Sequence, residues 1–211
     1  MIARMREHRG ELLALVAALS LSACSPHDPS FSATDSRLGL EIRTAHGSRD
    51  EVQKARQLAG VLAVHDLSAW IFTRSVVIDK DAVSHSHPVL TLGARHLGDD
   101  GLLLSEFVHE QIHWYLVSKE QQTEEAVAEL AALLPGAPVN EPEGAGSAQS
   151  TYLHLVVGWL EWDAMARLVG EAEALRVIQF WSGDHYRWDY RTLLSQRALI
   201  GGIVIRHGLL V

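Results

Sequence analysis

The stretch FVHEQIHWYL, residues 107–116, constrains this chain most, because it contains the pattern His-Glu-x-x-His. No proline or glycine interrupts residues 102–118, so we expect this segment to be helical. Side chains four residues apart lie on one face of a helix, which allows His109 and His113 to direct both imidazoles at one metal ion. Glu110 lies beside them. The pattern therefore predicts a helix that carries two metal ligands and a carboxylate next to them.

Two histidines and a carboxylate in this arrangement favour Zn²⁺ as the cofactor and hydrolysis as the reaction. Zinc lowers the pKa of a water that it binds and polarises a substrate carbonyl, and Glu110 is placed to accept the proton of that water as general base. The alternative is a chance arrangement, since the chain contains 12 histidines. The helical setting of the pattern favours the metal site.

The N-terminal segment has the layout of a bacterial export signal. Three arginines in residues 1–10 precede a run of about a dozen apolar or small residues, which is too short to span a membrane as a mature helix. The run ends in Leu-Ser-Ala-Cys, which resembles a lipobox, and Cys24 is the only cysteine of the chain. We therefore expect residues 1–23 to be a signal peptide and Cys24 to carry the lipid. The protein would be exported and anchored on the periplasmic side of a bacterial membrane, and Ser25 after the cysteine favours the outer membrane.

Residues 24–36 are expected to form the lipidated cysteine and a flexible tether, because this segment is rich in serine, proline and aspartate. Residues 37–211 then form a single domain, which is long enough to bury a core. The formal net charge of −8 excludes a nucleic-acid partner, since no basic stripe is available to neutralise phosphates.

Hydrophobic periodicity predicts an α+β fold, with a short β-sheet in the N-terminal half, the His-Glu-x-x-His helix, and a helical C-terminal half. In the first helix, Ser48 is the expected N-cap and Glu51 completes a capping box. The expected strands lie within residues 38–45, 70–79 and 87–97, and the expected helices within 48–66, 102–118, 123–134, 150–170, 171–181 and 190–205.

At this point the chain resembles the zincin metallopeptidases. The resemblance is carried by HEQIH, by the helical second half, and by the strand VLTLGA, residues 89–94, where zincins place the sheet edge that pairs with an extended substrate. It implies a zincin-like fold and a third protein ligand from further along the chain. The extended pattern HExxHxxGxxH is absent, because residues 114–123 contain neither glycine nor histidine.

Two residues in the segment STYLHLVVGWLEWDAM are candidates for the third ligand. His154 and Glu161 are seven residues apart, almost two helical turns, and so share a face. The sequence Glu161-Trp-Asp-Ala resembles the Glu-x-x-Ala pattern of gluzincins, which implies that Glu161 is the third ligand and leaves His154 as its rival. Whichever residue does not bind the metal could orient a ligand imidazole instead. Glu125 and Glu129 are a further possibility, although a solvated helix face explains them as well.

Other residues add to the expected site or are set aside. The zincin resemblance implies that His185 and Tyr186 stabilise the oxyanion, while aromatic packing beside Trp181 and Trp188 is the alternative. The pair His85 and His87 has no further ligand nearby and is interpreted as coincidence. No Gly-x-Ser-x-Gly sequence indicates a serine nucleophile.

Two classes of function follow. The first is a zinc-dependent hydrolase, a peptidase that cuts an exposed peptide or protein substrate in the cell envelope. The second is a metal-binding envelope lipoprotein with a binding or assembly role and no hydrolytic activity. The presence of Glu110 favours the first, because a structural zinc site needs no base between its histidines. The sequence indicates neither the substrate nor the oligomeric state.

Overall fold

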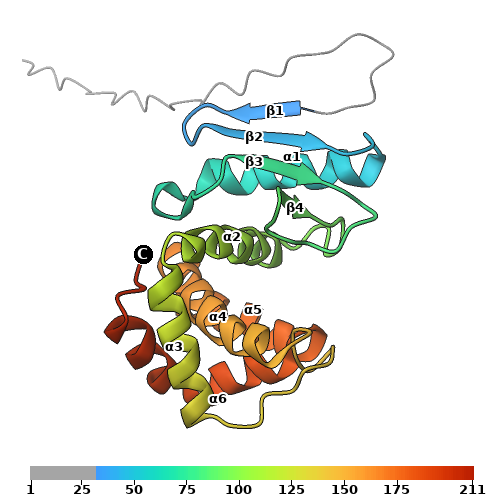
Figure 1. Ribbon diagram of the computed structural model, residues 1–211. Coiled ribbons are helices and arrows are strands. Elements are labelled where there is room, and N and C mark those ends of the chain that lie inside the picture. The colour runs from blue at the N-terminus through green and yellow to red at the C-terminus, as the bar shows by residue number, and fades with distance from the viewer. Residues whose placement is uncertain (1–31) are drawn as a thin grey trace, which may run out of the picture.

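The computed structural model describes residues 32–211, so the predicted signal peptide and Cys24 lie outside the described residues. The described chain has an α+β fold, with a four-stranded sheet in the N-terminal half and six α-helices. Figure 1 shows helix α2 (Asp100–Val117) between the sheet and the helices of the C-terminal half. One cluster of buried apolar side chains extends from the sheet to the last helix. The predicted fold class is thus confirmed at the level of its elements.

The sheet has the strand order β1-β2-β3-β4. Strand β1 is antiparallel to β2, whereas β2, β3 and β4 are parallel to one another. Each of the three predicted strand regions contains a strand. The strands are β1 (Ser32–Asp35), β2 (Leu40–Thr44), β3 (Ser75–Ile78) and β4 (Leu90–Leu92).

Strand β1 corrects the predicted boundary of the tether, which placed residues 32–35 outside the domain. The sequence Ser-Ala-Thr-Asp has no hydrophobic pattern of its own. Its strand conformation comes from pairing with β2, where Ala33 lies opposite Ile42 and is only 5% exposed. The folded region therefore includes Ser32–Asp35.

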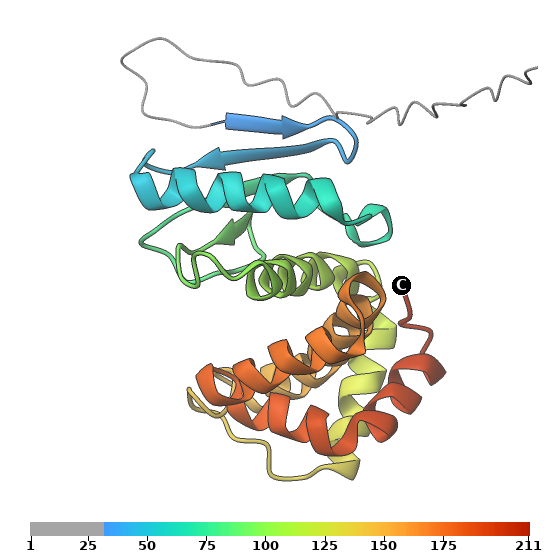
Figure 2. The ribbon, with the colours of Figure 1, turned by 180° about the vertical axis from the view of Figure 1, so that it is seen from behind.

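Helix α1 (Arg49–Val64) covers one face of the sheet (Figures 1 and 2). The predicted capping box is present, because Glu51 N–H donates to Ser48 Oγ at 3.3 Å and Ser48 N–H donates to Glu51 Oε2 at 2.9 Å. Burial raises the pKa of Glu51, but hydrogen bonds from the backbone of Ser48, Lys80 and His46 outweigh it and hold that pKa below its usual value. The same carboxylate thus starts α1 and ties the helix to the turn after β3. A short 3₁₀ helix, Ser68–Trp70, follows α1.

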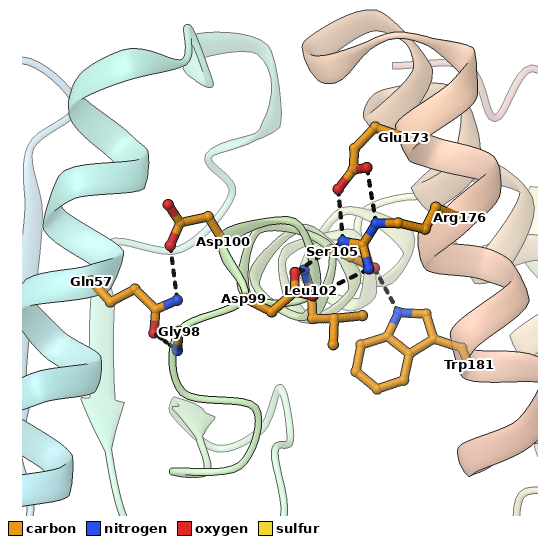
Figure 3. Close-up of polar contacts among 9 residues, drawn as sticks. All are labelled: Gln57, Gly98, Asp99, Asp100, Leu102, Ser105, Glu173, Arg176 and Trp181. Carbon is orange, nitrogen blue, oxygen red and sulfur yellow. Dashed lines mark hydrogen bonds and ion pairs between the residues drawn. The ribbon is translucent and has the colours of Figure 1, made fainter.

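Helix α2 is held at its N-terminus from two sides, as Figure 3 shows. The N-cap Asp99 accepts a hydrogen bond from Leu102 N–H at 2.9 Å and binds the guanidinium of Arg176 through both carboxylate oxygens. On the other side, Gln57 of α1 donates to Asp100 at 2.8 Å. The first turn of α2 is therefore fixed between α1 and α5 (Glu171–Asp184).

The helical half is organised around α4 (Ala148–Val169), which packs against α2, α3, α5 and α6. All of the predicted helices are present. The two remaining helices are α3 (Glu120–Leu133) and α6 (Arg187–Arg206). Within residues 32–211, no helix combines the length and the hydrophobicity needed to cross a membrane.

The contact between α4 and α6 depends on a glycine. Trp159 Nε1 donates to Arg197 C=O at 3.0 Å, and its ring lies against Gly201. A Cβ atom at Gly201 would lie 2.5 Å from Trp159 Nε1, whereas a Cβ atom at Gly202 would have nothing within 4 Å. Only the first of these adjacent glycines is required by packing.

We expect Gly201→Ala to lower the free energy of unfolding by about 1–3 kcal/mol, because the indole and the helix must move apart. Gly202→Ala is the matched control and should be neutral or stabilising by up to about 1 kcal/mol, since alanine has the higher helix propensity. Urea denaturation of the two variants measures both values. Equal effects of the two substitutions would contradict this account of the α4–α6 contact.

Candidate metal centre

Three histidines from two helices meet at the centre of the molecule. His109 and His113 come from α2 and His154 from α4, and one nitrogen of each lies within 4.8 Å of the others. The Nε2 atoms of His109 and His113 are 3.3 Å apart. Two nitrogens bound to one tetrahedral zinc at 2.0–2.1 Å are separated by about 3.4 Å. The spacing in the structure fits a shared metal ion.

Hydrogen bonds orient two of these imidazoles. His109 Nδ1 lies 2.9 Å from Glu161 Oε2, and His154 Nδ1 lies 2.7 Å from Ser150 C=O. Because both partners are acceptors, Nδ1 carries the proton in each ring. The Nε2 atoms then present lone pairs for a metal ion, the arrangement usual for ligand histidines.

Burial favours the neutral form of two of the three rings. Burial, followed by repulsion from His109, lowers the pKa of His154 to about 3 and holds that of His113 well below its usual value. Burial also lowers the pKa of His109, but the hydrogen bond and charge of Glu161 outweigh it and leave that pKa raised. Neutral imidazole is the form that binds metals, so His113 and His154 are in the ligand state at neutral pH.

Glu161 lies behind His109 rather than among the three ring nitrogens. Glu161 is 0% exposed. Its Oε1 atom accepts a hydrogen bond from Ser105 Oγ. Its Oε2 atom accepts from His109 Nδ1 and, at 3.0 Å, from Tyr190 OH. Trp181 Nε1 donates to Ser105 Oγ at 2.9 Å, as Figure 3 shows. Both oxygens of Glu161 are thus committed to donors from the protein.

The geometry therefore favours His154 over Glu161 as the third ligand, contrary to the implication of the Glu-x-x-Ala pattern. Seven residues along a helix correspond to about 10 Å, so only one of the two can reach a given point although both share a face. The residue of α4 that lies next to the ring nitrogens of His109 and His113 is His154. Glu161 instead orients the imidazole of His109 through its Nδ1 atom.

Glu110, together with His109, lines a cavity of about 190 Å³. The residue is 7% exposed, and burial, the largest effect, raises the pKa of its carboxyl to about 7. The charge of His109 opposes this shift, and that of Glu106 adds to it. A carboxylate with a pKa near the working pH is suited to general base catalysis.

His185 and Tyr186 line the same cavity, as the sequence predicts for residues near the site. His185 Nδ1 lies 2.8 Å from Asp184 Oδ2, which orients the ring. The rings of Tyr186 and His154 are 4.2 Å apart, and the backbone of Tyr186 has a φ of 45°, a conformation that is strained for a tyrosine. Burial raises the pKa of Tyr186 to about 12, so its hydroxyl is a neutral donor at pH 7. Aromatic packing, the alternative, is present as well, since the rings of Trp181 and His185 are 5.0 Å apart.

The resemblance to zincins implied that β4 forms a free edge of the sheet, but in the structure part of β4 is covered by another segment. His85 pairs in antiparallel fashion with Thr91 of β4 through hydrogen bonds of 3.0 and 2.8 Å. On this side of the sheet the outermost paired residue is therefore His85. In an antiparallel pair the next residue points its N–H and C=O away from the partner strand. Those groups of Ser84 have no partner among the described residues, and Ser84 lines the cavity with Glu110.

His87 lies on the other side of the metal site. Its ring stacks on Trp114 at 4.2 Å, and together with His113 it lines a second cavity of about 370 Å³. Neither His85 nor His87 belongs to a group that could hold a metal within residues 32–211.

Two other acidic sites are separate from the three histidines. His46, Asp79 and Asp81 form a second group that could hold a cation, but it is largely exposed, and Lys80 pairs with Asp81 at 2.6 Å. Glu129, a candidate from the sequence, instead binds His207 at 2.8 Å on the surface. Glu125 lies 3.6 Å from the same imidazole.

Several site residues were not anticipated from the sequence. Ser105 precedes His109 by one helical turn, so its position on the same face was available from the spacing. Tyr190 and Trp181 carry no comparable signal, because only the packing of α5 and α6 brings them to Glu161.

Comparison of the chain with protein-family models, with curated proteins and with solved structures found no match.

A further buried carboxylate lies near the site without a partner. Asp189 is 2% exposed, and neither of its oxygens has a hydrogen-bond partner within the described structure. Burial, opposed mainly by the charge of His109, raises the pKa of Asp189 to about 8. Since the folded-state pKa exceeds the unfolded value, this group destabilises the fold increasingly as pH rises from about 4 towards 8.

We expect Asp189→Asn to stabilise the metal-free protein by about 1–3 kcal/mol at pH 7 and to have little effect at pH 4, because asparagine cannot ionise in the unfolded state. Urea denaturation at pH 4, 5.5 and 7 measures the difference. Asp50→Asn, on an exposed first turn, is the control. A gain of equal size at pH 4 and pH 7 would show that the raised pKa is not its source.

Proposed function

We propose that this protein is a zinc-dependent hydrolase of the zincin type that acts as a peptidase. The observation that carries the proposal is the convergence of His109, His113 and His154, with the first two Nε2 atoms 3.3 Å apart and Glu110 at the adjacent cavity. Three histidine ligands that leave one position open are the mark of a catalytic zinc site.

Zinc bound there would supply Lewis-acid polarisation of a carbonyl and would lower the pKa of water. The chain's own residues have distinct roles beside it. Glu110 accepts a proton from the attacking water, for which a pKa of about 7 suits it. The Tyr186 hydroxyl and the His185 imidazole, oriented by Asp184, are donors to the developing oxyanion. Glu161 fixes the orientation of His109.

The substrate class follows from the edge of the cavity. Among the described residues, the N–H and C=O of Ser84 have no hydrogen-bond partner, and Ser84 lines the cavity with Glu110. An extended peptide can pair with such an edge through its backbone. We also include in this proposal the export signal and the lipid on Cys24, which are inferred from the sequence. Because they would place the protein in the bacterial envelope, the proposed substrate is a peptide or protein of that compartment.

The metal content of purified protein lacking residues 1–24 tests the ligand set. We expect about one zinc per chain in wild type and loss of zinc in His113→Ala and His154→Ala, because each removes one of three ligands. The Glu161→Gln variant should keep zinc but bind it about 10–100-fold more weakly, because the His109 imidazole is no longer held in its orientation. Elemental analysis and competition with a chelator measure these values. Loss of zinc in Glu161→Gln with retention in His154→Ala would reverse the assignment.

Glu110→Gln tests catalysis separately from metal binding. We expect the variant to keep zinc and to lose peptide hydrolysis by at least about 100-fold, because glutamine cannot accept a proton. Glu171→Gln, an exposed change on α5, is the matched control and should keep full activity. Cleavage of a mixed peptide library followed by mass spectrometry measures activity. Wild type with bound zinc and no hydrolysis would instead identify a metal-binding envelope lipoprotein.

A further inference from the structure

A buried ion pair joins helices α1 and α2 beside the cavity. Lys54 of α1 is 0% exposed, and its Nζ lies 2.9 Å from Glu106 Oε2 and 2.7 Å from the backbone oxygen of Arg95. The Glu106 side chain is 12% exposed. Replacing a buried ion pair by apolar side chains of similar volume is often neutral or stabilising. Stability of the fold alone is thus a weak reason for this pair.

The second oxygen of Glu106 reaches the edge segment of the sheet. Ser84 Oγ donates to Glu106 Oε1 and accepts from Gly93 N–H at 2.9 Å. Gly93 is needed for this close approach, because a Cβ atom there would lie 2.7 Å from Ala82 C=O. One carboxylate therefore holds Ser84 directly and Arg95 through Lys54.

Glu106 also occupies a fixed position relative to Glu110. The two residues are four apart on α2, so they lie on one face about one helical turn from each other. Ser84, Gly93, Arg95, Glu106 and Glu110 all line the same cavity. The helix that carries the general base thus also fixes the wall opposite it.

We propose that Glu106 and Lys54 are positioning residues that hold the backbone of Ser84 at a set distance from Glu110 and the three histidines, in register for an extended peptide. The inference rests on the proposed function and deepens it, because it assigns the alignment of the substrate to an ion pair outside the metal site. Loss of the ion pair leaves the three histidines in place. It weakens the binding only of those molecules that are long enough to reach Ser84.

The test compares two probes on the zinc-loaded protein. Acetohydroxamate binds the metal alone, whereas a tripeptidyl hydroxamate also extends into the cavity. The double variant Lys54→Met/Glu106→Leu removes both charges and keeps the volume, which protects the fold. Ser84→Ala removes only the hydroxyl, and Ser84→Thr restores it. Arg206→Met, which breaks a surface ion pair with Glu129 between α6 and α3, is the control.

In the double variant and in Ser84→Ala we expect tripeptidyl hydroxamate to bind about 10-fold more weakly, the equivalent of one lost hydrogen bond, with binding of acetohydroxamate within about 2-fold of wild type. Peptide hydrolysis should fall through KM with kcat nearly unchanged. Ser84→Thr and Arg206→Met should behave as wild type.

Equal weakening of both probes, or no change in either, would overturn the inference. Wild type that binds the longer probe more tightly but hydrolyses no peptide would contradict the proposed peptidase and leave the role of the pair in alignment standing. Wild type without zinc would overturn both.

Discussion

The hydrogen bonds of the Glu161 carboxylate hold together both the helical half and the candidate metal site. The carboxylate is completely buried on α4 and accepts from Ser105 and His109 of α2 and from Tyr190 of α6. A buried carboxylate without these donors would carry a large desolvation cost, so the three helices are bound to one arrangement. That arrangement brings His154 to the two histidines of α2.

The cavity joins the two halves of the fold. Its helical side supplies Tyr186 and His185, and its sheet side supplies Ser84 and Arg95. Helix α2 belongs to both, since its N-terminus is fixed between α1 and α5 (Figures 1 and 3). The middle of the helix carries Glu110. The low exposure that raises the pKa of Glu110 results from this position between the halves.

Features that depend on local periodicity were predictable. The helix around HEQIH, the capping box of α1 and strands β2, β3 and β4 all follow from spacing within short segments. Features that depend on a partner strand were not. Strand β1 has no pattern of its own, and His85 covers the edge of β4 through a loop whose sequence gives no strand signal. The Glu-x-x-Ala resemblance pointed to Glu161, whereas the crossing of α2 and α4 brings His154 next to His109 and His113.

The sequence by itself determined which residues share a helix face: His109 with His113, and His154 with Glu161. Helical geometry fixes these relations without reference to the rest of the chain. The tertiary structure decided which member of the second pair meets the first, because that choice depends on where two helices cross. It also decided that Tyr190 and Ser105 hold Glu161, and that Lys54 and Glu106 hold the opposite wall. These contacts join residues far apart in the chain, and only the packing of the core brings them together.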